Sequence, residues 1–149
     1  MRTAEAQLQL ETFLPYRLSV LSNIVSTRIA RVYSSQFGLS IPEWRVIAVL
    51  AMTPGLSSGD VAQRTAMDKV MVSRAVSRLL KAGRIEKRVG SVDRRSSHLT
   101  LSAKGRLIYA KVVPLAKGIE ARLIGALGPE EGVAFTDAMT KLLEAAPNI

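Results

Sequence analysis

Residues 69–105 read "KVMVSRAVSRLLKAGRIEKRVGSVDRRSSHLTLSAKG", and this stretch decides the fold. Its first part repeats apolar residues at helical spacing and reaches Gly83, a residue type that commonly follows the last turn of a helix. Two short segments with alternating apolar residues come next, at 84–89 and 97–101, and the polar sequence "GSVDRRS" joins them. The pattern predicts a helix followed at once by a β-hairpin with a polar tip.

Further helices are expected on both sides of this stretch. Their ranges are 11–37, 40–52, 56–67, 103–127 and from 128 onward. Ser40 and Glu43 have the spacing of a capping box, Asp68 can cap the helix at 69–83, and Pro114 predicts a kink. The expected fold class is mainly α with a short β-hairpin wing, in the order typical of a winged helix-turn-helix protein.

The positive charge is concentrated in the middle of the chain. Residues 64–106 hold twelve basic and three acidic residues, and the difference of nine equals the net charge of the whole protein. The remaining residues are therefore neutral as a group. Such a field is typical of a nucleic-acid site, although a solvated basic face without a partner remains the alternative.

Composition excludes several other classes of protein. The sequence has no Cys, so disulfides and thiolate metal sites are ruled out, and the lone His98 does not suggest a metal site. The N-terminus lacks the apolar core of a secretory signal, and the longest apolar run, "VIAVLAM", is too short to span a bilayer. We expect a cytoplasmic protein with no cofactor, no metal and no membrane partner.

Three segments carry a resemblance to a known family. The sequence "DRRSSHLTLSAKG" (93–105) resembles the wing of the MarR family of bacterial transcriptional regulators, which reads Asp-x-Arg, a strand, then Leu-Thr-x-x-Gly. Here Ser102 replaces the usual Thr. The sequences "EWRVIAVL" (43–50) and "MDKVMVSRAVSRLLKAGRIEKR" (67–88) resemble the second helix and the recognition helix of the family. The resemblance extends over nearly the whole chain.

The resemblance implies a homodimer and a division of labour along the chain. Residues 1–149 would form one subunit, with a winged helix-turn-helix DNA-binding region at 40–101. The ranges 8–37 and 102–146 would form a helical dimerisation region. A symmetric dimer predicts a pseudo-palindromic double-stranded operator with half-sites about 34–36 Å apart. Repression is the usual mode of the family.

The candidate DNA-binding residues are Lys69, Val70, Ser73, Arg74, Ser77, Arg78, Arg88, Arg94 and Arg95. Arg74 and Arg78 are the leading candidates for reading bases, although either can contact phosphate instead. At the wing, an Arg can enter a narrow minor groove. By the family pattern Asp93 pairs with Arg95 and orients the wing, which leaves Arg94 for DNA. Met71 is expected to pack rather than to contact DNA.

The resemblance also implies control by a small molecule. MarR-like proteins commonly release DNA when an anionic or phenolic compound binds between the dimer helices and the winged domain. The candidate ligand-binding residues are Tyr16, Arg17, Asn23, Arg28, Trp44 and Tyr109. Trp44 can instead belong to the core. The segment "FLPYRLSVLSNIVS" (13–26) resembles members that sense aromatic acids or their CoA thioesters, so such an effector is expected.

Two other functions remain open at this point. The sequence "GLSSG" (55–59) matches the Gly-x-Ser-x-Gly of serine hydrolases, and Asp93 and His98 follow in triad order. That motif requires a strand before the Ser, whereas a helix is expected here, so no catalytic residue is assigned. A nucleic-acid architectural protein without ligand control would bind DNA with a steep salt dependence and no sequence preference.

Overall fold

The computed structural model describes residues 6–89 and 97–149. Its main elements are α1 (Leu14–Phe37), α2 (Ile41–Met52), α3 (Ser58–Thr65), α4 (Lys69–Lys81), β1 (Ile85–Val89), β2 (Ser97–Leu101), α5 (Ala103–Ile124) and α6 (Pro129–Ala145). The predicted order of helices and strands, and the mainly α fold class with a hairpin, are confirmed. The chain divides into two compact units, Met1–Val112 and Val113–Ile149.

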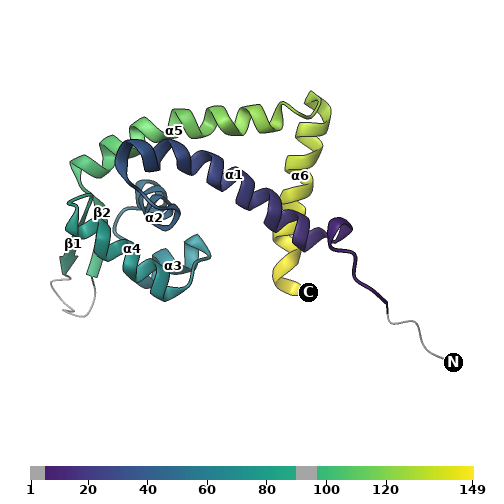
Figure 1. The fold of residues 1–149 in the computed structure, drawn as a ribbon. Coiled ribbons are helices and arrows are strands. Elements are labelled where there is room, and N and C mark those ends of the chain that lie inside the picture. Colours follow the sequence, from purple (N-terminus) through teal and green to yellow (C-terminus); the bar gives the residue numbers. More distant parts are fainter. Residues whose placement is uncertain (1–5, 90–96) are drawn as a thin grey trace. The chain divides into compact units, whose positions relative to one another are not determined.

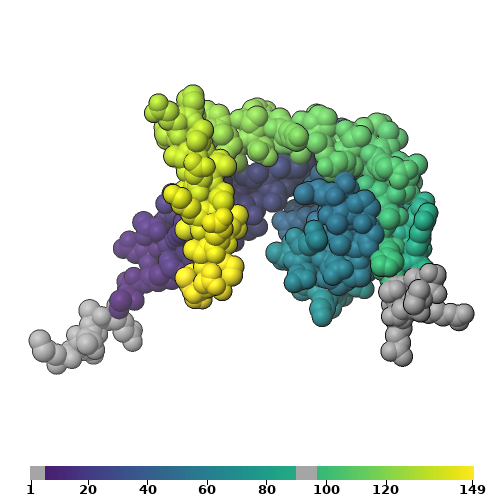
Figure 2. Space-filling view, turned by 180° about the vertical axis from the view of Figure 1, so that it is seen from behind, coloured from purple at the N-terminus to yellow at the C-terminus, as the bar shows by residue number. Residues whose placement is uncertain are grey.

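The core of the first unit joins the helix-turn-helix to the hairpin. Val46 and Ile47 on α2 are fully buried, and so is Leu79 on α4. Leu99 on β2 is also fully buried in the same cluster. Figure 1 shows α2, α3 and α4 gathered beside the two strands. In Figure 2 the atoms of α2, α3 and α4 form one continuous body. Helix α4, which corresponds to the recognition helix, is thus held in place by a close-packed core.

Side chains at the N-termini fix where α2, α3 and α4 begin. The hydroxyl of Ser40 accepts a hydrogen bond from the backbone N–H of Glu43 at 3.3 Å, and the hydroxyl of Ser57 accepts one from the N–H of Asp60 at the start of α3. Asp68 accepts from the N–H of Met71 at 2.8 Å at the start of α4. Each of these bonds satisfies a helix N–H that would otherwise lack a partner.

The hairpin is attached to the turn that follows α2. Strands β1 and β2 are antiparallel, and Ile85 lies opposite Leu101. The N–H of Leu99 donates to the carbonyl of Leu56 at 2.9 Å, and the N–H of Gly55 donates to the carbonyl of Leu99 at 2.9 Å. These two bonds to the chain at 55–56, together with the burial of Leu99, hold β2 against the helix-turn-helix.

The start of α5 packs against the end of α4. The hydroxyl of Ser102 donates to the carbonyl of Gly83 at 2.6 Å and accepts from the N–H of Gly105 at 3.1 Å. Gly83 has a left-handed φ of 70° after the last turn of α4, as predicted. Ser102 thus caps α5 and also satisfies the carbonyl of Gly83, which follows the recognition helix.

The second unit contains the end of α5 and all of α6. Pro114 lies inside α5, next to the boundary between the two units, and the kink expected there stays a prediction. Gly132 of α6 is buried, with Ile124 of α5 nearby. Across residues 6–89 and 97–149, the helices all lack the combination of length and hydropathy that crossing a membrane requires.

Candidate nucleic-acid interface

The recognition helix α4 has one buried and one solvent-exposed side. Val72 and Leu79 are almost completely buried, and Ala75 and Val76 are buried with them. The exposed side carries the predicted polar residues Lys69, Ser73, Arg74, Ser77 and Arg78. This separation follows from the 3.6-residue period of the helix, because residues three or four positions apart lie on the same side. The exposed side can enter a major groove without disturbing the core.

Two apolar residues on α4 also face solvent near its N-terminus. Val70 is 62 % exposed and Met71 is 43 % exposed. Met71 is expected to pack rather than to contact DNA, yet more than two fifths of it remains accessible, so that alternative stays untested. Both residues lie beside Lys69 and Arg74, where an apolar side chain can contact a thymine methyl group.

A groove of about 570 Å³ runs between the start of α2 and the exposed side of α4. Its polar lining includes Ser40, Asp68, Lys69, Arg74 and Arg78. Three basic side chains and one carboxylate thus line one continuous depression. An excess of basic groups in a groove suits a polyanionic backbone.

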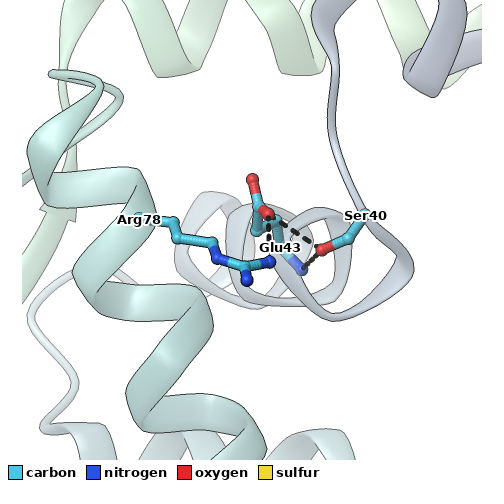
Figure 3. A network of polar contacts seen from close by, with 3 residues as sticks. All are labelled: Ser40, Glu43 and Arg78. Carbon is cyan, nitrogen blue, oxygen red and sulfur yellow. Dashed lines mark hydrogen bonds and ion pairs between the residues drawn. The ribbon is translucent and has the colours of Figure 1, made fainter.

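Glu43 connects the two walls of this groove (Figure 3). Its Oε1 accepts a hydrogen bond from the Ser40 hydroxyl at 2.9 Å and lies 3.9 Å from Nη1 of Arg78. The capping box predicted for Ser40 and Glu43 is present with one change, since the Glu side chain accepts from the Ser hydroxyl. The sequence did not reveal the contact with Arg78, which joins α2 to α4 through two residues that are 35 positions apart along the chain.

The structure describes only part of the predicted wing. Asp93, Arg94 and Arg95 lie outside the described residues, so the proposed pairing of Asp93 with Arg95 stays a prediction. Arg88, also predicted to bind DNA, lies on β1 opposite His98 and lines a different pocket from the recognition-helix groove. Its contact with DNA likewise stays a prediction.

That second pocket lies among α2, the hairpin and the start of α5. It has a volume of about 640 Å³, and Arg88, Arg106 and Glu86 supply its charged groups. Leu50, Leu101 and other apolar residues line the rest, together with the predicted ligand residue Tyr109. Sequence reasoning missed Arg106, although it lies three residues before Tyr109 and therefore on the same side of a helix.

The other candidate ligand residues are not gathered at that pocket. Tyr16 and Arg17 are exposed near the start of α1, and Asn23 and Arg28 line a shallow depression along the same helix. Trp44 and Tyr109 are brought together elsewhere in the subunit, with their ring centroids 5.9 Å apart.

Trp44 is the middle member of a stack of three aromatic rings. Tyr33 lies on its other side at 5.4 Å and is almost completely buried. Burial raises the pKa of Tyr33 to about 12, and the nearby charge of Arg45 lowers it by a smaller amount. Trp44 is only partly buried, so it contributes to the core while remaining beside Tyr109 and the pocket.

The residues of the hydrolase motif have structural contacts. Ser57 caps α3, and Nδ1 of His98 lies 2.9 Å from the carbonyl oxygen of Gly55. Leu56 forms an isolated bridge with β2 rather than ending a parallel strand, so no nucleophile elbow is formed. No group of acidic or His side chains suited to a metal ion occurs among residues 6–89 and 97–149.

The fold and the exposed basic helix define a winged helix-turn-helix DNA-binding protein. Comparison with known proteins finds similarity to one family of regulators. The sequence model of the MarR family matches residues 37–96. An HTH-type transcriptional repressor of Mycobacterium tuberculosis is 27% identical over 108 residues, which are 72% of this chain and 78% of that protein.

Solved structures agree with this assignment. A MarR family transcriptional regulator from Silicibacter pomeroyi superposes with a TM-score of 0.77 at 26% identity, over 95% of this chain and 94% of that one. The PcaV regulator of Streptomyces coelicolor, solved with its natural ligand, has the same fold at 22% identity, with a TM-score of 0.76 over 95% and 99% of the two chains. The chain resembles the MarR family, and the proteins it matches are transcriptional regulators rather than enzymes. Together with the fold, this similarity indicates a DNA-binding transcriptional regulator.

Proposed function

We propose that this protein is a cytoplasmic homodimeric repressor that binds a pseudo-palindromic operator and releases it when an aromatic acid or its CoA thioester binds. The observation that carries the proposal is the two-sided character of α4. Its basic side is exposed to solvent, and its apolar side is buried in the core. Residues 40–101 would form the DNA-binding region of each subunit, and the ranges 8–37 and 102–146 would form the dimerisation region.

Operator reading is assigned to the exposed side of α4 and to the wing. Arg74 and Arg78 have exposed side chains, and each guanidinium group can make two hydrogen bonds to guanine. Lys69 and the Ser residues supply contacts to phosphate or base edges. At the wing, Arg94 would enter the minor groove, while Asp93 holds Arg95 through a charge-assisted pair.

Exposed apolar side chains support the homodimer. On α1, Leu14, Leu18, Leu21 and Ile24 are between 38% and 62% exposed within one subunit. On α6, four more apolar residues are exposed, namely Val133, Phe135, Leu142 and Leu143. Apolar surface on this scale is costly in water and is typical of a subunit interface.

The pocket of Arg88, Arg106 and Tyr109 supports a ligand with both charged and aromatic character. A carboxylate can pair with either Arg, and the apolar lining and Tyr109 can accommodate a ring. Because β1 and β2 form one wall, a ligand there can change how the wing is presented. The candidate residues on α1 would have to reach such a site from the partner subunit or serve a second one.

DNA selection tests the proposal directly. The full-length protein is incubated with a pool of random DNA duplexes, and bound duplexes are enriched and sequenced. We expect one inverted repeat, bound far more tightly than a scrambled duplex of the same composition. Enrichment of no sequence, together with equal affinity for both duplexes, would favour the architectural alternative and contradict the proposal.

Ligand control is tested with the enriched duplex. Aromatic carboxylic acids and their CoA thioesters are titrated into the complex, and release is followed by fluorescence anisotropy. Trp44 is the only Trp and stacks on Tyr109, so its emission reports binding at the pocket independently of DNA. A panel that neither releases DNA nor changes this emission would eliminate that class of effector.

A further inference from the structure

We propose that Glu43 is a positioning residue that sets the operator specificity of the protein by orienting Arg78. This inference rests on the proposed operator binding and adds a residue outside the recognition helix to it. Glu43 is 7 % exposed and lies in the first turn of α2. It has no DNA-facing role of its own, because its carboxylate is directed at Ser40 and Arg78.

The carboxylate is held in place before it meets the arginine. Ser40 donates to Oε1 of Glu43 at 2.9 Å, and the backbone N–H of Glu43 donates back to the same hydroxyl at 3.3 Å. A negative charge is also favourable in the first turn of a helix. Glu43 therefore has a fixed position that depends on α2 alone, and it can act as a reference point for a side chain on α4.

Arg78 is oriented by this carboxylate but not withdrawn from solvent. Its Nη1 lies 3.9 Å from Oε1, which is the distance of an ion pair rather than a hydrogen bond. The side chain is 70% exposed and lines the groove together with Lys69 and Arg74. The remaining N–H groups of the guanidinium therefore stay available to DNA.

Two physical effects follow for DNA binding. An arginine whose conformation is already restricted loses less side-chain entropy when it meets a specific base or phosphate. The negative charge also weakens the attraction of the groove for any phosphate backbone, whatever the sequence. The first effect raises the ratio of specific to non-specific affinity, whereas the second acts on both affinities alike. Removing Glu43 should therefore tighten non-specific binding and, through the lost orientation of Arg78, lower that ratio.

The experiment measures affinity for the enriched duplex and for its scrambled counterpart with full-length variants. Glu43→Gln keeps the shape of the side chain and removes its charge. Asp60→Asn is the matched control, because it makes the same change in net charge at an exposed site on α3. Glu43→Asp keeps the charge and draws the carboxylate back from Arg78. Thermal unfolding confirms that each variant is folded at the temperature of the assay.

We expect Glu43→Gln to lower the specificity ratio about threefold per subunit, or roughly tenfold for a dimer, as is reasonable for a solvated ion pair. Glu43→Asp should lower it too, whereas Asp60→Asn should change affinity for both duplexes alike. In an Arg78→Ala background, Glu43→Gln should have no further effect on the ratio.

Three results would overturn the inference: an unchanged ratio in Glu43→Gln and Glu43→Asp, an equal fall in Asp60→Asn, or an undiminished effect without Arg78. Each of them leaves operator binding by the wild-type protein intact. A wild-type protein that does not distinguish the two duplexes would overturn the proposed function as well, so the two failures are distinguishable.

Discussion

Gly105, in the first turn of α5, lies directly against the backbone carbonyl oxygen of Arg84, and no side chain would fit between them. A Cβ at Gly105 would collide with that oxygen and would also lie 3.2 Å from the carbonyl carbon of Arg84 and 3.4 Å from Leu101. The Gly of the Leu-Ser-x-x-Gly sequence is therefore needed for close packing of α5 on the chain that leaves the recognition helix.

Gly105→Ala should destabilise the protein by at least about 2 kcal/mol, because backbone atoms cannot move aside as a flexible side chain would. The measurement is chemical unfolding followed by circular dichroism. Gly118→Ala is the matched control, since a Cβ there meets nothing within 4 Å. The control should be stabilised by about 0.5–1 kcal/mol through its higher helix propensity. Equal stabilities of the two variants would contradict the packing described here.

Ser102 gives a second prediction at the same junction. Ser102→Ala removes both the bond to the Gly83 carbonyl and the bond from the Gly105 N–H, and should cost about 1–3 kcal/mol. Ser102→Thr keeps the hydroxyl and should remain within about 1 kcal/mol of wild type. If Thr were as damaging as Ala, the role of the hydroxyl would be wrong, and crowding at this buried site would explain the loss.

The raised pKa of Tyr33 predicts that the free energy of unfolding falls at high pH. Its pKa is about 12 in the folded protein and near 10 when unfolded, so the folded state holds the proton more tightly. The resulting stabilisation, about 3 kcal/mol, is complete below pH 10 and is lost as the pH rises through 12.

Unfolding free energies measured across this range should therefore fall less steeply in Tyr33→Phe than in wild type. Tyr16→Phe, which changes an exposed Tyr on α1, should behave as wild type. A Tyr33→Phe protein with an unchanged slope would show that this burial does not govern the titration.

The exposed apolar side of α1 predicts a subunit interface. Leu21→Asp should shift the protein from dimer towards monomer, because it places a charge on a surface expected to be buried between subunits. Met52→Asp, which changes a more exposed apolar residue at the end of α2, should leave the dimer intact. Sedimentation velocity distinguishes the two results, and a Leu21→Asp variant that remained fully dimeric would exclude this surface.

The sequence predicted the helices and strands well because their signals are local. Ser40, Asp68 and Gly83 have the residue types that cap helices, and each is found at the predicted position. The buried stripe of α4 also follows from its period, with Val72 and Leu79 fully enclosed.

Contacts between distant parts of the chain could not be predicted in this way. The approach of Glu43 to Arg78 depends on how α2 packs against α4, and no short-range pattern encodes that distance. The same holds for Arg88, whose assignment to DNA came from charge alone, while its position on β1 gives it a pocket shared with Arg106. Charge identifies a basic region, but packing decides which groove each cation faces.

The central claim is that the exposed side of α4 reads the operator, and Arg74 tests it most directly. Affinities for the enriched and scrambled duplexes are measured for wild type, Arg74→Ala and Arg31→Ala, an equal charge change at an exposed residue of α1. Arg74→Ala should bind the enriched duplex at least about tenfold more weakly, as expected for loss of a specific contact, and Arg31→Ala should match wild type. Wild-type affinity in Arg74→Ala, or an equal loss in Arg31→Ala, would contradict the claim.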